Sequence, residues 1–462
     1  MSRRQLLQTS KITSRTSRSA KDGLRTLARG TQPSVEQLPP HAMLPSRMFW
    51  RSLLVSTVSN NRLLLSSAVA VLSFLARQRG GFFNMNNNLI LRFALKKTLY
   101  NHFCAGENSL EVQSTIRHIK DMGFRGVILT YAAEVVVDSK TKREAGTGAK
   151  EIKDGVVHAN VEENRGGDTA IAAWRQGVLE TVRMIGDGDH LALKLTGGGA
   201  AVADALASCE SLPLQMSQAL EDICSEAMQR KARILVDAEQ QFVQPGIDIV
   251  AMDLMRKYNR GQRAVVYNTY QAYLKTTPHV LQRHILQAQK EDFIIGIKLV
   301  RGAYINSEPR HLINDTKKDT DLTYNSIARS LLQQQFPLQG PESRSAPFPR
   351  IELFLATHNK SSTLIAWNLQ KDLSSMGKPL VKVQFGQLLG MADEISCTLL
   401  LEKGMSATPL DVYKCLSWGS VGDCISYLLR RAVENRDAVT RTEAEHAALK
   451  KEAVRRLKAV FG

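Results

Sequence analysis

Two lysines interrupt segments of the sequence that are otherwise apolar, and an uncompensated charge inside such a segment would be costly. Lys194 lies in LALKL, which starts at Leu191, and Lys298 lies in IIGIKLV, which starts at Ile294. Each lysine could belong to a structural ion pair or to a binding or catalytic site. Polar residues also lie at or just beyond the ends of segments of this kind: Tyr131, Glu134, Asp237, Glu239, Gln271, Arg301, Thr357, His358 and Asn359.

The elements that would position these residues form a regular pattern. Short β-branched segments alternate with amphipathic helical stretches, which indicates β-α units and a parallel sheet. Eight strands are the number that closes a (β/α)8 TIM-like barrel, an α/β fold in which the carboxyl ends of the strands meet at one rim. We therefore expect the polar residues to gather at that rim. The predicted strands are GVILTY at Gly126, LALKL at Leu191, RILVDAE at Arg233, AVVYNTY at Ala264, IIGIKLV at Ile294, IELFLATH at Ile351, LVKVQFG at Leu380 and VYKCL at Val412.

Positive charge is concentrated at the N-terminus. The formal net charge is +17, but residues 1–106 carry sixteen Lys or Arg against only two acidic residues, Asp22 and Glu36. The first thirty residues are rich in Arg, Ser and Thr, a composition typical of a mitochondrial transit peptide. A basic nucleic-acid-binding arm is the alternative, but these thirty residues contain no aromatic side chain to stack on bases.

The chain is predicted to have three parts. Residues 1–45 form a transit peptide and a linker, residues 46–106 a helical N-terminal segment, and residues 107–462 the barrel. The apolar run Leu63–Ala76 is shorter than the roughly 20 residues that cross a bilayer, so we expect a packed helix or one that rests on a membrane surface. Residues 138–168 and 337–349 are predicted to be surface insertions.

Common cofactor and metal fingerprints are missing from the sequence. No GxGxxG follows a predicted strand, and neither GxxxxGKS nor GxxxxGKT occurs, so a bound dinucleotide would lie across the barrel mouth rather than on a Rossmann sheet. The six cysteines have no CxxC or other metal-ligand spacing. We therefore expect reduced thiols and no metal site.

Seven motifs follow one another in the order of the chain. They are HFCAGE at His102, VDAE at Val236, NTYQAYLK at Asn268, KLVRGAY at Lys298, ATHN at Ala356, QLLGM at Gln387 and YLLRRAVEN at Tyr427. Together they resemble the proline dehydrogenase (proline oxidase) family over about residues 99–439, and the chain looks like a fungal-type mitochondrial member. KLVRGAY and YLLRRAVEN are the most specific of these motifs.

The resemblance implies an FAD-dependent enzyme. It would oxidise L-proline to Δ1-pyrroline-5-carboxylate, the first step of proline catabolism, by hydride transfer from C5 of the neutral amine to flavin N5. The electrons would then pass to a quinone. The resemblance also implies a location on the matrix side of the mitochondrion, with peripheral contact to the inner membrane, and no nucleic-acid partner.

The resemblance also assigns roles to individual residues of this chain. Asp237 and Lys298 would lie in the catalytic centre. Arg430 and Arg431 would clamp the substrate carboxylate, since guanidinium groups stay charged and donate paired hydrogen bonds, and Glu434 would hold a guanidinium in place. The remaining substrate-binding positions are Lys194, Tyr304, Leu388 and Cys415. The cofactor-binding positions are Ala238, Gln271, Arg301, Gly302, Ala303, Thr357 and His358.

One position departs from the pattern of the family. A tyrosine is usual fifteen residues before the first clamp arginine, and here Cys415 takes its place. Hydroxyproline-oxidising relatives also have a smaller residue there, so hydroxyproline dehydrogenase is the alternative within the enzyme class. A catalytically silent barrel with a basic arm for nucleic acid or acidic membranes is the alternative from another class, and the intact set of strand-end residues argues against it.

Overall fold

The structure is a computed structural model that describes residues 39–77, 88–132, 135–138, 143–146, 167–338, 340, 347–434 and 439–461. The chain divides into two compact units, Met1–Pro39 and Pro40–Gly462. All elements below belong to the second unit. The predicted transit peptide lies outside the described residues, and its assignment stays a prediction.

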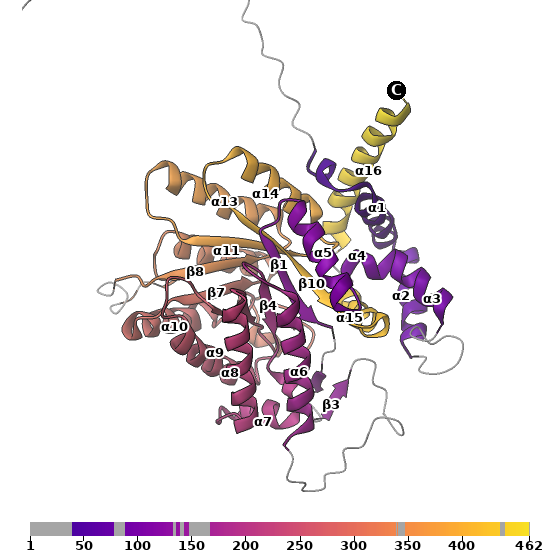
Figure 1. Ribbon diagram of the computed structural model, residues 1–462. Helices are drawn as coiled ribbons and strands as arrows, with labels where there is room; N and C mark the ends of the chain where they lie inside the picture. The colour runs from indigo at the N-terminus through magenta and orange to yellow at the C-terminus, as the bar shows by residue number, and fades with distance from the viewer. Residues whose placement is uncertain are drawn as a thin grey trace, which may run out of the picture. The chain divides into compact units, whose positions relative to one another are not determined.

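Eight parallel strands close into a barrel, which confirms the predicted fold (Figure 1). Each of the eight segments that the sequence marked as a strand contributes one. The closed order is β1-β10-β9-β8-β7-β6-β5-β4, so strands that follow one another along the chain are neighbours. The strands are β1 Gly126–Tyr131, β4 His190–Leu193, β5 Arg233–Val236, β6 Val266–Gln271, β7 Ile295–Val300, β8 Ile351–Ala356, β9 Lys382–Leu388 and β10 Asp411–Trp418.

Helices surround the barrel and bury one face each against it (Figure 1). In α8, Met216, Leu220 and Ile223 are buried, whereas Met228 in the last turn is 48% exposed. A capping box between Thr316 and Asp319 starts α11. The surrounding helices are α5 Ser109–Asp121, α6 Thr169–Met184, α7 Ala200–Ser208, α8 Leu214–Gln229, α9 Gln244–Tyr258, α10 Thr277–Glu291, α11 Lys317–Leu332, α13 Lys360–Ser375 and α14 Asp393–Met405.

The barrel interior holds its own apolar cluster, separate from the larger core between strands and helices. Its buried members include Ile128, Leu235, Phe354 and Tyr413, and Cys415 packs against them. Because side chains alternate along a strand, Cys415 faces the interior while its neighbours in β10 face the helices. The cysteine thus lies on the inner wall of the barrel.

A helical segment precedes the barrel, as predicted. Helix α1 packs against the C-terminal helix α16, and helices α2 and α3 pack against a cluster that includes α15 (Figure 1). Among the described helices none alone is long and apolar enough to cross a bilayer, although α1 and α2, bent by 102°, pass that test of length and composition together. The bounds are α1 Ser46–Asn60, α2 Arg62–Arg77, α3 Leu89–Leu95, α4 Asn101–Phe103, α15 Val421–Glu434 and α16 Val439–Phe461.

The end of the predicted linker also takes part in the folded unit. His41 and Leu44 are buried, and Arg456 of α16 donates to the carbonyl oxygens of both. β2 (Val135–Asp138), which ends where the first predicted insertion begins, pairs antiparallel with β3 (Arg143–Gly146) inside that insertion, and the sequence does not predict these two strands. Most of the remaining residues of that insertion lie outside the described part of the chain.

Candidate active site

The two residues predicted for the catalytic centre form an ion pair at the carboxyl ends of the strands. Lys298 Nζ lies 2.6 Å from Asp237 Oδ1. Lys298 belongs to β7 and Asp237 directly follows β5, so the pair reaches across β6. The side chains are 13% and 25% exposed, respectively. Asp237 therefore compensates the charge of Lys298, which would be unfavourable in an apolar strand without a partner. The pair remains accessible from the rim.

Arg301, which directly follows β7, ties three elements of the rim together. Its guanidinium donates to Asp321 Oδ1 at 2.8 Å, to Thr357 Oγ1 at 2.5 Å and to Ser362 Oγ at 2.8 Å. It also lies over the ring of Tyr324, 4.4 Å from the centroid. Burial alone would raise the pKa of Asp321, but hydrogen bonds from Lys317 and Arg301 and their charges lower it. Arg301 thus has a fixed direction at the rim.

Gln271 and the loop after β7 bring three predicted cofactor positions together. Gln271 Nε2 donates to the carbonyl oxygen of Glu239 at 3.1 Å, and its Oε1 accepts from the backbone N–H of Ala303 at 3.2 Å. Gly302 has φ +147°, and a Cβ atom built there would lie 2.4 Å from the ring of Tyr273. This turn therefore requires glycine, because any side chain would collide with the tyrosine.

His358, Leu388 and Cys415 form a second group on the adjoining strands. The backbone N–H of Leu388 donates to His358 Nε2 at 3.1 Å. Leu388 at the end of β9 is paired in register with Cys415 of β10, which is in turn paired with Ile128 of β1. These residues make one side of the rim continuous with the inner wall of the barrel.

Glu239 is a rim residue that the assigned set left out, although the sequence marks it as an acidic residue beyond the third strand. It is 5% exposed and accepts hydrogen bonds from both the backbone N–H and the hydroxyl of Thr196. Burial raises its pKa, against the opposing charge of Lys194 and the bonds from Thr196. Lys194 itself lies just after β4 instead of within it, and its carbonyl oxygen accepts from Trp174 Nε1 at 3.0 Å.

Three of the assigned positions are placed by the backbone alone. Arg430, Arg431 and Glu434 lie in the C-terminal part of α15, and their side chains fall outside the described part of the structure. Ala238 lies half-buried between Asp237 and Glu239, while Tyr304 lies in the loop after β7. Among the described residues, no group of three or more His, Cys, Asp or Glu could hold a metal ion.

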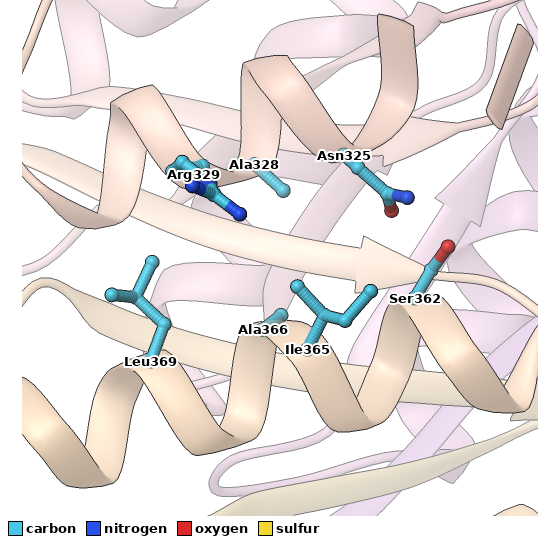
Figure 2. Close-up of a pocket in the computed structure, with 7 residues that line it drawn as sticks. All are labelled: Asn325, Ala328, Arg329, Ser362, Ile365, Ala366 and Leu369. Atoms are coloured by element: carbon cyan, nitrogen blue, oxygen red, sulfur yellow. The ribbon is translucent and has the colours of Figure 1, made fainter. Parts of the chain in front are cut away.

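A small hollow lies outside the barrel between α11 and α13 (Figure 2). Ser362, which also accepts from Arg301, lies at one end of it near Asn325. The other lining residues are Ala328, Arg329, Ile365, Ala366 and Leu369. The lining is mostly apolar, so it offers few groups for chemistry, and the rim of the barrel remains the candidate site.

The carboxyl ends of the strands in a closed parallel barrel, where this chain carries its paired charges, are where barrel enzymes place their active sites. A family model described as proline dehydrogenase matches residues 112–444, which is more than half of the chain. The chain therefore belongs to the proline dehydrogenase family, and it is an oxidoreductase that oxidises proline.

Individual relatives agree with this membership. The probable mitochondrial proline dehydrogenase of Schizosaccharomyces pombe is 30% identical over 399 residues, covering 78% of this chain and 80% of that protein. Hydroxyproline dehydrogenase of Xenopus laevis is 28% identical over 389 residues, covering 80% of each. The chain spans only 37% of the 32% identical proline dehydrogenase 1 of Caenorhabditis elegans, and the match covers 51% of this chain.

Solved structures show the same fold. Proline utilization A from Bdellovibrio bacteriovorus, described as inactivated by N-propargylglycine, superposes with a TM-score of 0.59 at 16% sequence identity. The match covers 85% of this chain and 38% of that one. The chain thus corresponds to about two fifths of the length of this larger protein, and at this identity the likeness concerns the fold alone.

Proposed function

We propose that this chain oxidises L-proline to Δ1-pyrroline-5-carboxylate with FAD as its cofactor. The observation that carries the proposal is the ion pair between Lys298 and Asp237, with Arg301, Gln271 and His358 on neighbouring strands of the same rim. All five residues belong to motifs that match the family. Barrel enzymes bind substrates and cofactors at this rim, so one site can take both.

The rim residues fit an anionic, flat cofactor of this kind. Lys298 and Arg301 supply positive charge, and among its described bonds Arg301 uses three of the five guanidinium hydrogens. The exposed backbone at Gly302 and Ala303 leaves room for close approach. We assign the same role to Ala238, Gln271, Thr357 and His358. When bound, FAD would supply the two-electron oxidation by accepting a hydride.

The remaining rim residues would hold and orient proline. Arg430 and Arg431 of α15 would bind its carboxylate in a bidentate manner, and Glu434, three and four residues further on, can fix a guanidinium on the same helix face. Leu388 and Cys415 would form the apolar wall next to the ring, with Lys194 and Tyr304 completing the pocket. Asp237 would keep Lys298 in place, so that a positive charge lies beside the reacting atoms.

The test is the colour of the purified protein and its response to substrate. We expect a flavin absorption spectrum that bleaches when L-proline is added without oxygen, and no bleaching with D-proline at the same concentration. The variant Arg430→Met/Arg431→Met is the matched control, because it should keep the flavin and lose the response to low proline. A flavin-containing wild-type protein that proline does not bleach would refute the proposed activity.

Hydroxyproline is a second candidate substrate, and Cys415 is the observation that favours it. The thiol lies on the inner wall where the family usually has tyrosine, and three relatives that are 28–29% identical are named hydroxyproline dehydrogenases. Extra space permits the added hydroxyl, but a pocket without dedicated hydrogen-bond partners discriminates by only about a hundredfold. A thiol is a weak partner, so we expect proline to remain the better substrate.

The variant Cys415→Tyr tests whether this residue sets the preference between proline and hydroxyproline. We expect the variant to lose hydroxyproline turnover more than proline turnover, with the ratio of the two kcat/KM values as the readout. Cys415→Ala is the control, because it keeps the small volume and adds no hydrogen-bonding group. An unchanged ratio in Cys415→Tyr would mean that this residue does not govern selectivity. A wild-type ratio in favour of hydroxyproline would make that substrate the natural one.

We further propose that electrons pass to a membrane quinone, in a mitochondrial enzyme on the matrix side of the inner membrane. Helices α2 and α3 support peripheral contact, since Leu63 and Ile90 are each 80% exposed and Phe93 is 64% exposed. The sequence between Glu36 and Glu107 contains no acidic residue, so this surface suits an anionic lipid headgroup layer. Flotation with anionic vesicles tests this contact, with Leu63→Glu/Phe93→Glu expected to abolish it and neutral vesicles as the control.

A further inference from the structure

Lys414 carries a buried charge in the barrel wall that the proposed reaction does not use. It lies in β10, and its Nζ is 2.7 Å from Asp393 Oδ1 at the start of α14. Both side chains are only 3% exposed. Desolvating two ions costs several kcal/mol each, and replacing such a pair by apolar residues is often neutral for stability. Stability alone is therefore a weak explanation for this pair.

The lysine also binds the loop that connects β9 with α14. Its Nζ donates to the carbonyl oxygen of Met391 at 3.1 Å and to that of Leu388 at 3.5 Å. Within this loop Gly390 has φ +71° and Ala392 has φ +53°, and the left-handed region is costly for alanine. The surrounding contacts must therefore hold the loop in this conformation.

Contacts from both ends of the folded unit reach the same loop. His102 Nε2 lies 3.0 Å from the carbonyl oxygen of Gly390, and Ser52 of α1 donates to Asp393 Oδ2 at 3.2 Å. The backbone N–H of Asp393 donates to Glu445 Oε1 of α16 at 2.9 Å. The loop is thus fixed from α1, from α16 and from the barrel strand at once.

The loop between β9 and α14 contacts Leu388 and Cys415, the two residues of the proposed pocket wall. Leu388 begins the loop and pairs in register with Cys415, and the backbone N–H of Leu389 donates to the carbonyl oxygen of Cys415 at 2.9 Å. Lys414 directly precedes Cys415, so it faces outward where the cysteine faces inward. The ion pair therefore acts on both wall residues from outside the barrel.

We propose that Lys414 and Asp393 are positioning residues that set the place of Leu388 and Cys415 in the substrate pocket. They act through the backbone of the loop and do not touch the substrate. The inference rests on the proposed function, which assigns Leu388 and Cys415 to the wall. It predicts that affinity for proline and selectivity between proline and hydroxyproline depend on charges outside the barrel.

The test is the double variant Lys414→Met/Asp393→Asn, which removes both charges and leaves neither buried alone. We expect it to keep its flavin, while KM for proline rises on the order of tenfold and the hydroxyproline-to-proline ratio of kcat/KM changes, because small displacements of pocket groups have large effects. The control is Arg233→Met/Glu352→Gln, a pair with side chains 7% and 6% exposed at the amino ends of β5 and β8. This control should leave KM unchanged even if it lowers the unfolding midpoint.

A folded, flavin-containing double variant with KM and selectivity within twofold of wild type would overturn the proposal. If that variant does not fold, Asp393→Asn is measured instead, since it removes the carboxylate that holds Lys414 and keeps the shape of the side chain. For Asp393→Asn a raised KM supports the positioning role, and an unchanged KM overturns it. The proposed function is judged separately, because it stands or falls with the bleaching of wild-type protein by proline.

Discussion

The coupling between Lys298 and Asp237 can be measured by a double-mutant cycle with Lys298→Met and Asp237→Asn. Their atoms are 2.6 Å apart, and the side chains are 13% and 25% exposed, so the pair is largely shielded from water. Breaking a fully buried pair costs about 3 to 5 kcal/mol, and exposed pairs are worth below about 1 kcal/mol. Given this partial exposure, we expect a coupling of about 2 kcal/mol in the free energy of unfolding.

The assay is chemical denaturation of the wild type, the two single variants and the double variant. A matched control comes from Arg175 and Asp222, which join α6 to α8 at 2.7 Å with side chains 43% and 48% exposed. We expect a coupling below about 1 kcal/mol for that pair. The flavin-bleaching rate with proline is measured on the same proteins, and each single variant at the rim should slow it by on the order of a hundredfold.

Two results would refute this reasoning. A coupling at the rim equal to that of Arg175 and Asp222 would mean that water screens the rim pair like a surface pair. Full coupling with an unchanged bleaching rate would mean that the pair is structural, and that Lys298 is not beside the reacting atoms.

Three further predictions follow from single residues. Gly302→Ala should lose flavin, because its Cβ atom would lie 2.4 Å from the ring of Tyr273; flavin absorbance per protein measures this, and full occupancy would contradict it. Arg431→Met should keep flavin but weaken proline binding by about 2 to 4 kcal/mol, as seen in bleaching titrations, and an unchanged affinity would rule out the clamp. Burial and then the Asp393 carboxylate raise the pKa of Glu445 to about 7 from 4.5. The stability that its proton contributes is therefore full below pH 4.5 and is lost as pH rises through 7, so Glu445→Gln should flatten the pH dependence of the unfolding midpoint in that window, and an unaltered pH profile would contradict the assignment.

The barrel could be predicted because its determinants are local. Each strand is a short β-branched run between helical stretches, and the number of runs matches the closed fold. The rim followed from the same pattern, since residues at the ends of parallel strands must meet. Asp237 and Lys298 were thus expected near one another, although their direct pairing across β6 needed the structure.

The partners of buried polar groups could not be predicted in this way. Glu239 binds Thr196 through a contact between two loops, and no sequence period relates them. The alternation of side chains along β10 predicts that Lys414 faces the helices. Its partner Asp393, however, lies at the start of a helix in the neighbouring β-α unit. Contacts of this kind depend on the conformations of the loops, which bring together residues that are far apart in the sequence.

Helices α1 and α16, which lie outside the barrel, contact the proposed site through Asp393. The family match spans residues 112–444, whereas Ser52 of α1 precedes it and Arg456 of α16 follows it. Arg456 lies over the ring of Phe49 at 4.2 Å, so α16 is held on α1, and Ser52 and Glu445 of these two helices bind Asp393. The proposed positioning role of Asp393 and Lys414 therefore predicts that two chains with identical rim motifs differ in selectivity if their terminal helices differ. On that proposal, the residue at position 415 sets the size of the pocket, and the terminal helices help to set where that residue lies.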